Sequence, residues 1–405
     1  MQTFKYTARD PVTGKKISDQ IAAESEQGAA KAIQKNGLSV IEVKATKGGE
    51  SFFGKIKGRV SAKDKVLFSR QLSTLINAGL PLVQGLRNVE GQTQNKNFKE
   101  IINTVITDVE SGSAFADALK KHPLVFDDVF VYLVAAGEAS GTLDKVLERL
   151  ANQKEKDAEI VSKIRGAMIY PVIVLLVMIA VVVFMIVSVI PTVKEVYSGI
   201  PGATLPLVTQ VLLWISNVTI KYWWLELIII GLIIFLASRW VNTLGGKRFV
   251  DKLKLSMWPI DRLFMKVYMA RFTRVGSTLV ASGVPLIQML EIDGRAVNNI
   301  HIRESINHAI DKVKGGKSLS SSLKGDPNFL PLVPDMLRIG EQSGSVEQML
   351  SKTADYYERE VDNEIKAITT TIEPLLMVIM GIVAITIVVA SLLPVYNLVG
   401  KDLLN

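Results

Sequence analysis

The sequence has no cysteine, only three histidines and 7% aromatic residues. The absence of cysteine excludes disulfide bonds, iron-sulfur clusters, cysteine-ligated zinc and thiol nucleophiles. Charged residues make up 21% of the chain and hydrophobic residues 48%. A length of 405 residues predicts two or three domains. The apolar residues are not spread evenly, because several long runs contain few polar side chains.

Three of these runs are long enough to cross a bilayer. Residues 172–190 are 19 consecutive positions in which Ser188 is the only polar side chain. As a helix they span about 28 Å, close to the ~30 Å hydrocarbon core. Residues 375–393 repeat this pattern, and residues 222–240 carry tyrosine and tryptophan at their ends, as is typical of membrane interfaces. The sequence therefore predicts three spanning helices.

Basic residues near the ends of the three runs predict their orientation. Eleven lysines and arginines lie on one set of flanks and three on the other. This asymmetry places residues 1–171 and 239–374 in the cytoplasm and residues 191–221 and 394–405 outside. The N-terminus lacks the apolar core of a signal peptide, so the first domain is expected to stay in the cytoplasm. The net charge of +8 can face anionic lipid or an acidic partner, and no motif favours nucleic acid.

The chain contains an internal repeat. Residues 68–86 align without gaps on residues 272–290, with ten identities in nineteen positions. Gly137–Gly141, with the sequence GEASG, matches Gly340–Gly344, with the sequence GEQSG. The alignment extends to the first and third apolar runs, which are therefore equivalent. The second run returns the chain across the bilayer, so the two halves are expected to be related by an axis along the membrane normal.

Each repeat has helical periodicity. Apolar residues recur at helical spacing over residues 68–76. Gly79 and Pro81 predict a left-handed end to this helix and the start of the next one, and Gly283 and Pro285 repeat the pattern.

A long helix is expected from about Thr142 towards Pro191, interrupted only by Gly166 and Pro171. It runs from the water-soluble part of the repeat into the first apolar run. Each half of the chain is therefore predicted to be a small helical bundle whose last helix becomes its membrane anchor.

Residues 1–45 have a different pattern, which predicts a ββαβ module. Alternating or β-rich stretches indicate strands at 3–8, 17–22 and 38–43, and a helix is expected at 24–36. The lysine- and glycine-rich stretch that follows, up to residue 60, predicts a linker.

No motif favours catalysis. Gly315–Ser318 ends like a phosphate-binding loop, but the glycine that the loop needs five residues before Gly316 is Asp311. An interhelical turn is the better interpretation. His301 and His308 are seven positions apart, about 10 Å along a helix, which is too far to chelate one ion. No catalytic, cofactor-binding or metal-binding residues are therefore expected, and the chain is not predicted to be an enzyme.

Three carboxylates are candidates for special roles. Glu226 lies inside the second apolar run, where snorkelling or pairing with Lys221 is favoured over a proton relay. Glu138 and Glu341 occupy the same place in the two repeats, each between glycines. They are expected to stabilise the N-terminus of the long helix that follows, with a partner-contact role as the alternative.

Residues 70–82, with the sequence RQLSTLINAGLPL, and Gly137–Gly141, together with their second copies, resemble the type II secretion F-domain family. Its members are inner-membrane platform proteins of type IV pilus and type II secretion machines (PilC and GspF types). The resemblance covers essentially the whole chain. It implies an all-α membrane protein with two duplicated cytoplasmic helical-bundle (F) domains, three transmembrane helices and a small α+β N-terminal module. One departure is Gly276, which stands where the first repeat has Leu72.

The resemblance also implies a function. Platform proteins hydrolyse nothing themselves and use no cofactor. They assemble as dimers or higher homo-oligomers at a cytoplasmic hexameric ATPase, among other inner-membrane assembly proteins, and couple it to the insertion of pilin or pseudopilin subunits into a filament. The sequence leaves open whether the client belongs to a pilus, a secretion system or a DNA-uptake system. The competing hypothesis is an oligomeric transporter or channel subunit, which would need polar or broken positions at midmembrane in matching helices.

The expected layout combines these segments. It comprises the N-terminal module at 1–45, a linker at 46–60, F domain 1 at 61–168, transmembrane helix 1 at 169–190, an external loop at 191–221, transmembrane helix 2 at 222–240, a connector with F domain 2 at 241–373, transmembrane helix 3 at 374–394 and an external tail at 395–405. The repeated motif residues are the candidates for structural or partner-contact roles: Arg70, Gly79, Pro81, Gly137, Glu138, Gly141, Arg274, Gly283, Pro285, Gly340, Glu341 and Gly344.

Overall fold

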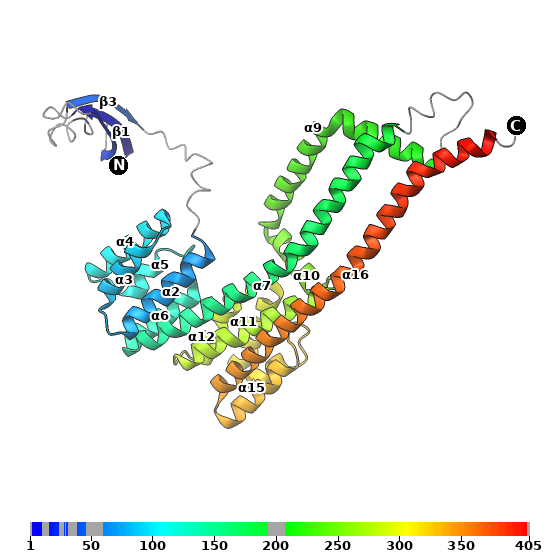
Figure 1. Cartoon of the computed structure of the whole chain (residues 1–405). Helices are drawn as coiled ribbons and strands as arrows, with labels where there is room; N and C mark the ends of the chain where they lie inside the picture. Colours follow the sequence, from blue (N-terminus) through cyan, green and yellow to red (C-terminus); the bar gives the residue numbers. More distant parts are fainter. Residues whose placement is uncertain are drawn as a thin grey trace. The chain divides into compact units, whose positions relative to one another are not determined.

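The computed structural model describes residues 2–9, 16–23, 28, 30, 39–45, 60–192 and 207–402 (Figure 1). The chain divides into two units. One comprises Met1–Val60 with Asn95–Phe98, and the other comprises Ser61–Gln94 with Lys99–Asn405.

The first unit contains a three-stranded antiparallel sheet of β1 (Gln2–Arg9), β2 (Lys16–Ala23) and β3 (Ser39–Ala45). The strand order is β2-β1-β3, and a bulge interrupts the β1–β3 ladder between Thr7 and Ala8. The strands occupy the stretches where alternation predicted them. The helix expected at 24–36 lies outside the described residues except for two positions, so the complete ββαβ arrangement stays a prediction.

The second unit begins with a helical bundle. Its elements are α2 (Ala62–Asn77), α3 (Leu82–Gln92), α4 (Lys96–Glu110), α5 (Phe115–Lys120), α6 (Asp128–Ser140) and the first turns of α7 (Leu143–Phe184). Ser61 and Asp64 form a reciprocal capping box at the start of α2. Phe68 and Leu72, on the periodic apolar face of α2, are fully buried.

The second bundle repeats these elements in the same order. They are α11 (Asp261–Ala281), α12 (Leu286–Ala296), α13 (Ile300–Lys314), α14 (Leu319–Leu323), α15 (Leu332–Ser343) and α16 (Val346–Asp402). The cores repeat as well. The rings of Phe68 and Phe126 are 5.4 Å apart in the first bundle, and the equivalent Phe272 and Phe329 are 5.2 Å apart in the second.

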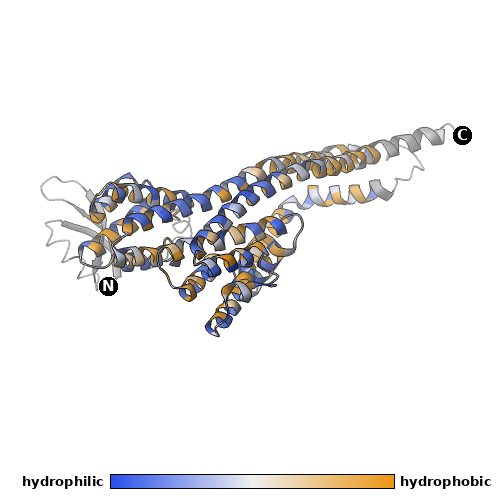
Figure 2. Cartoon of the chain, turned by 90° about the horizontal axis from the view of Figure 1, so that it is seen from below, coloured by the Kyte–Doolittle hydropathy of each residue, from blue (hydrophilic) through white to orange (hydrophobic). Residues whose placement is uncertain are grey.

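Within the described part of the chain, three helices are long and apolar enough to cross a membrane, spanning Leu143–Thr192, Gln210–Val241 and Val346–Val389. The first is α7 continued through a π-helical segment, Met185–Val189. The second belongs to α9 (Leu207–Val241) and the third to α16. In Figure 2 hydrophobic residues fill the parts of the long helices that lie beyond the bundles.

The expected loop at 191–221 differs from the structure, because residues 207–221 are already helical. Tyr222, the predicted start of the second span, is a break within α9, with non-helical angles of φ −121° and ψ 23°. The helix before the break is held by Ser216, which is fully buried and donates to the carbonyl of Ile186 in the π-helical segment. The polar residue Ser216 thus lies within the helix, with its hydroxyl bonded to the π-helical segment that continues α7.

The two long helices α7 and α16 also contact each other. Val361, Ile365 and Ile368 of α16 form a buried cluster with Leu263 of α11. Partly buried apolar side chains of α7, including Ile160, pack against this cluster. The helix that ends the first bundle is thus part of the hydrophobic core of the second.

Candidate functional site: the repeated motifs and the contact between the bundles

An arginine joins the first and last helices of each bundle. The Arg70 Nε donates to Glu155 Oε1 at 2.6 Å, and its Nη2 donates to Asn152 Oδ1 at 2.6 Å. In the second bundle the Arg274 Nε lies 2.8 Å from Glu358 Oε1, and its Nη2 lies 2.5 Å from Asp355. These partners are on α7 and α16, so each arginine clamps α2 or α11 to the long helix.

The two clamps differ in exposure. The side chain of Arg70 is 37% exposed, whereas that of Arg274 is 22% exposed and its partner Glu358 is 14% exposed. Hydrogen bonding to Arg70 lowers the pKa of the Glu155 carboxyl. The Arg274–Glu358 pair is therefore the less solvated of the two, and removal of one partner would leave the other charge partly buried.

The glycine-proline motif has the predicted conformation. Gly79 has φ +84° and Gly283 has φ +78°, both in the left-handed region. In each bundle the glycine and the residue after it donate to carbonyls of the last turn, as at Gly79 N to Ile76 O, 2.9 Å. Pro81 and Pro285 then stand at the N-cap positions of α3 and α12.

The two glycines of the second motif have different roles. The first allows close helix packing, and the second ends a helix. A Cβ added to Gly137 would lie 3.0 Å from the side chain of Val146, and one added to Gly340 would lie 2.8 Å from the Cα of Val346. Gly141 and Gly344 both have φ +69° and end α6 and α15 in the left-handed conformation. The motif thus makes the sharp turn into each long helix.

The glutamates of this motif cap a different helix from the one expected. Glu138 accepts from the backbone nitrogens of Phe115 at 2.8 Å and Ala116 at 3.2 Å, at the start of α5. Glu341 accepts from Leu319 N at 2.6 Å and also binds Ser320, at the start of α14. The expectation that these acids stabilise the following long helix was wrong. They tie the short helix before them to α6 or α15 through its free N–H groups.

The other tested motifs are structural. Gly315–Ser318 is the turn between α13 and α14, and Ser318 caps α14 through Ser321 N. The carboxylate of Glu341 already occupies the N-terminus of α14. Glu226 accepts from Thr219 Oγ1 at 3.1 Å, whereas Lys221 lies over the ring of Tyr222 at 5.4 Å. The pairing of Glu226 with Lys221 was therefore wrong.

Charged side chains also join the two bundles. Lys163 of α7 lies 2.7 Å from Asp362 of α16. Arg295 of α12 lies 2.8 Å from Asp128 of α6. The remaining pairs are Arg271 with Asp157 at 3.6 Å and Lys156 with Glu358 at 3.9 Å. The first bundle and its long helix are therefore held to the second bundle at several points.

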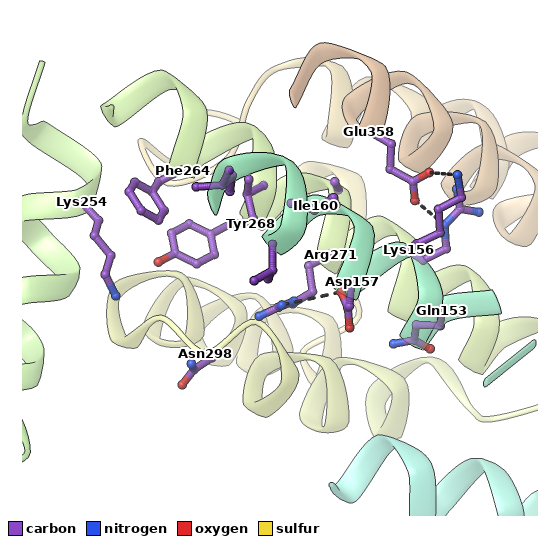
Figure 3. Close-up of a pocket in the computed structure, with 15 residues that line it drawn as sticks. Gln153, Lys156, Asp157, Ile160, Lys254, Phe264, Tyr268, Arg271, Asn298 and Glu358 are labelled. Carbon is purple, nitrogen blue, oxygen red and sulfur yellow. Dashed lines mark hydrogen bonds and ion pairs between the residues drawn. The ribbon is translucent and has the colours of Figure 1, made fainter. Parts of the chain in front are cut away.

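A cavity of about 190 Å³ lies between α7, α11 and α16 within this contact. Figure 3 shows Arg271 and Asp157 meeting at its edge and Lys156 meeting Glu358. Gln153 of α7 lines the cavity and is 5% exposed, and its Oε1 has no hydrogen-bond partner among the described residues. The cavity is lined by both polar and apolar side chains of these helices.

The two bundles coincide with two copies of a known domain. The type II secretion system protein F domain matches residues 68–191 and again residues 272–394, and the N-terminal domain of the same protein matches residues 1–44. The chain belongs to the type II secretion system protein F family.

Full-length relatives agree with this assignment. The chain is 38% identical to the type IV pilus assembly protein PilC of Thermus thermophilus, over 99% of both chains. It is 35% identical to the PilC of Pseudomonas aeruginosa, over 90% of this chain and 97% of the relative. It is 32% identical to the type II secretion system protein F of the same organism, over 98% and 99%. The resemblance inferred from the repeated motifs is confirmed.

The second F domain contains a buried carboxyl that sequence analysis missed. Asp293 of α12 is fully buried, and neither of its oxygens has a hydrogen-bond partner among the described residues. Burial raises its pKa well above the usual value, and the charge of Arg271 opposes this only in part. The signal was available in the repeat, because the equivalent position in the first F domain is the buried Val89.

The ion pairs between the F domains were also missed. They involve charged residues that look like an ordinary solvated helix face in the sequence, such as Lys163 and Asp362. The sequence gives one indication of these pairs. The long helix predicted from Thr142 carries charged residues well beyond the part that packs in its own bundle.

Proposed function

We propose that this protein is the inner-membrane platform of a type IV pilus or type II secretion machine. In this role it couples a cytoplasmic assembly ATPase to the insertion of pilin or pseudopilin subunits into a filament. The observation that carries the proposal is the unbroken continuation of each F domain into a helix with a candidate membrane span, Leu143–Thr192 and Val346–Val389. The names of the relatives, type IV pilus assembly protein and type II secretion system protein F, support the same role.

The mechanism follows from the continuity of these helices. Each one continues through a proline at the entry to its apolar run, Pro171 in α7 and Pro374 in α16, so a push or rotation of an F domain would reach the apolar part of its helix across that position. The clamps Arg70–Glu155 and Arg274–Glu358 fix each bundle to its long helix. The Lys163–Asp362 pair and the apolar cluster between α7 and α16 would couple the two helices to each other.

In the proposed topology residues 1–171 and 239–374 face the cytoplasm, and the N-terminus lies inside while the C-terminus lies outside. The basic flanks of the three apolar runs support this orientation. The F domains would contact the hexameric ATPase, and the apolar helices would meet the apolar N-terminal helix of the pilin and other assembly proteins. Assembly as a homodimer or higher homo-oligomer is part of the proposal.

Deleting the gene tests the function. We expect the deletion strain to lose surface filaments or the secreted client, while the purified assembly ATPase keeps its basal activity. Wild-type protein should restore filaments in the deletion strain. The double variant Arg274→Glu with Glu358→Arg should restore more filaments than Arg274→Glu alone. Filaments and secretion that persist in the deletion strain, or a defect only in solute uptake, would contradict the platform role and favour a transporter.

A further inference from the structure

A short helix follows the second candidate span at a fixed angle. α10 (Leu244–Ser256) begins three residues after α9 ends at Val241 (Figure 1). A Cβ on Gly246 would lie 1.9 Å from the carbonyl oxygen of Trp240, so the turn requires glycine there. The rings of Trp240 and Phe249 pack at 5.5 Å. The direction of α10 is therefore set by the end of α9.

One side of α10 is fixed to the second F domain. Asp251 is 2% exposed and accepts from Ile300 N at 3.1 Å, at the start of α13. Its other oxygen lies 3.2 Å from Lys254, and Asn299 Nδ2 donates to its backbone carbonyl at 3.4 Å. These contacts also fix the rotation of α10 about its own axis.

The opposite side of α10 presents large apolar side chains to the surroundings. Phe249 is 55% exposed and Leu253, one turn later, is 40% exposed. At 100° per residue both point away from Asp251. Trp258, just after the end of the helix, is 70% exposed, and Leu244, at its start on the side of Asp251, is 85% exposed. In a water-exposed helix such a face would carry a free-energy cost.

The same segment is strongly basic. Between residues 239 and 258 the one acidic residue is Asp251, which is buried and paired. The basic residues are Arg239, Lys247, Arg248, Lys252 and Lys254. Lys252 borders the apolar face beside Leu253. Arg248 and Lys247 lie towards the second F domain, where Arg248 pairs with Glu304 at 2.5 Å and Lys247 lies 3.4 Å from Asn298 Oδ1.

We propose that α10 lies in the surface of the membrane leaflet where α9 ends, and that it binds anionic phospholipid there. Phe249 and Leu253 enter the boundary between headgroups and acyl chains, and Lys252 faces the phosphate groups. Interfacial helices have this combination of a basic border and an apolar face. Lipid is the occupant because α9 is itself long and apolar enough to span the bilayer, and because Trp240 at its end packs on the exposed face. The inference depends on α9 spanning the membrane and not on the proposed function.

Site-directed spin labelling of the full-length chain tests this proposal. The sequence has no cysteine, so Leu253→Cys provides a single labelling site, and Ser321→Cys on the exposed side of α14 provides the control. Each labelled protein is reconstituted in nanodiscs of phosphatidylcholine alone or with phosphatidylglycerol. Collision of the label with oxygen, which concentrates in lipid, is compared with collision with a water-soluble nickel complex.

We expect the label at 253 to collide with oxygen and to be shielded from nickel, more strongly in discs that contain phosphatidylglycerol. The label at 321 should remain accessible to nickel in both discs. Lys252→Gln should reduce the inserted fraction at 253 by roughly fivefold. The matched control Lys317→Gln, on an exposed lysine of the second F domain, should not change it.

Three outcomes would overturn the proposal. One is nickel access at 253 as high as at 321 in both kinds of disc, which would show a water-facing helix. A second is equal insertion with and without phosphatidylglycerol, which would remove the role of anionic lipid. A third is shielding at 253 that appears only when an assembly protein is added, which would identify a protein as the occupant.

Discussion

Gly276 lies directly against Asp293 in the core of the second F domain. A Cβ at position 276 would be 3.3 Å from Asp293 Oδ2 and 3.5 Å from the sulfur of Met289. In the first F domain the large and small residues are reversed, because Leu72 fills the position of Gly276 and Gly85 that of Met289. A Cβ on Gly85 would lie 3.3 Å from a methyl group of Leu72. The departure from the repeat at Gly276 thus makes room for a carboxyl and a methionine.

Asp293→Asn should make the stability of the protein less dependent on pH. Burial raises the folded-state pKa of Asp293 above the usual value of 3.8. The contribution of Asp293 to the free energy of unfolding is therefore full below about pH 4. It falls by about 1.4 kcal/mol per pH unit as the pH rises to the folded-state pKa. The variant should unfold at a higher temperature than wild type at pH 8 and at a similar temperature at pH 4, measured by circular dichroism in detergent. Asp311→Asn, on an exposed side of α13, is the control, and parallel pH profiles for Asp293→Asn and wild type would refute the expectation.

Gly79→Val should destabilise the first F domain by about 1–2 kcal/mol, because a side chain is strained at positive φ. No heavy atom lies within 4 Å of a Cβ built on Gly79, so the loss would come from the backbone at φ +84° and not from a collision. Gly79→Asn should cost less, since asparagine tolerates this conformation. Gly166→Ala, in α7 with the same open surroundings, should be neutral or stabilising in the same thermal melt. Equal melting temperatures for Gly79→Val and wild type would argue against a strained cap.

Glu138→Ala should loosen α5 and leave α7 unchanged. The variant removes the acceptor for Phe115 N and Ala116 N, and lost N-terminal caps cost about 0.5–2 kcal/mol. Amide hydrogen exchange in α5 should then accelerate by roughly 2- to 30-fold. Glu148→Ala, on an exposed side of α7, is the control. Faster exchange confined to the first turn of α7 would instead show that Glu138 stabilises the start of the long helix.

Arg274→Ala should cost more stability than Arg70→Ala. The exposed Arg70 pair is expected to contribute roughly 0.2–1 kcal/mol. The less exposed Arg274, which binds Asp355 and Glu358, is expected to contribute about 1.5–3 kcal/mol. Thermal unfolding of the two variants in parallel measures the difference. If both variants melt like wild type but fail to copurify with the assembly ATPase, the arginines are contact residues and not clamps.

The sequence predicted those features whose causes are local. The turn at Gly79 and Pro81 follows from the backbone preferences of two residues, and the repeat places the same turn at Gly283 and Pro285. The bundles, their helix order and the long helix from Thr142 follow from periodicity and from the lack of helix breakers. The apolar runs identified the three membrane-capable helices by composition alone.

The features that were missed depend on contacts between distant parts of the chain. Glu138 binds α5 because α5 folds back on α6, and no local pattern indicates which helix end reaches the carboxylate. The Lys163–Asp362 pair joins residues 199 positions apart. The helix over residues 207–221 includes Ser216, whose partner Ile186 lies in the π-helical segment 30 positions earlier, and the mixed polarity of the segment does not reveal this contact.

The two F domains place a large and a small residue in opposite order, since Leu72 faces Gly85 and Gly276 faces Met289. This difference bears on how the duplicated gene can evolve. Gene conversion that copied α2 onto α11 would place leucine opposite methionine, and the reverse event would leave two glycines facing each other. The first product is overpacked and the second contains a void, and both lose stability. The two positions can therefore be exchanged without this loss only together, as the helix pair α2–α3 or α11–α12.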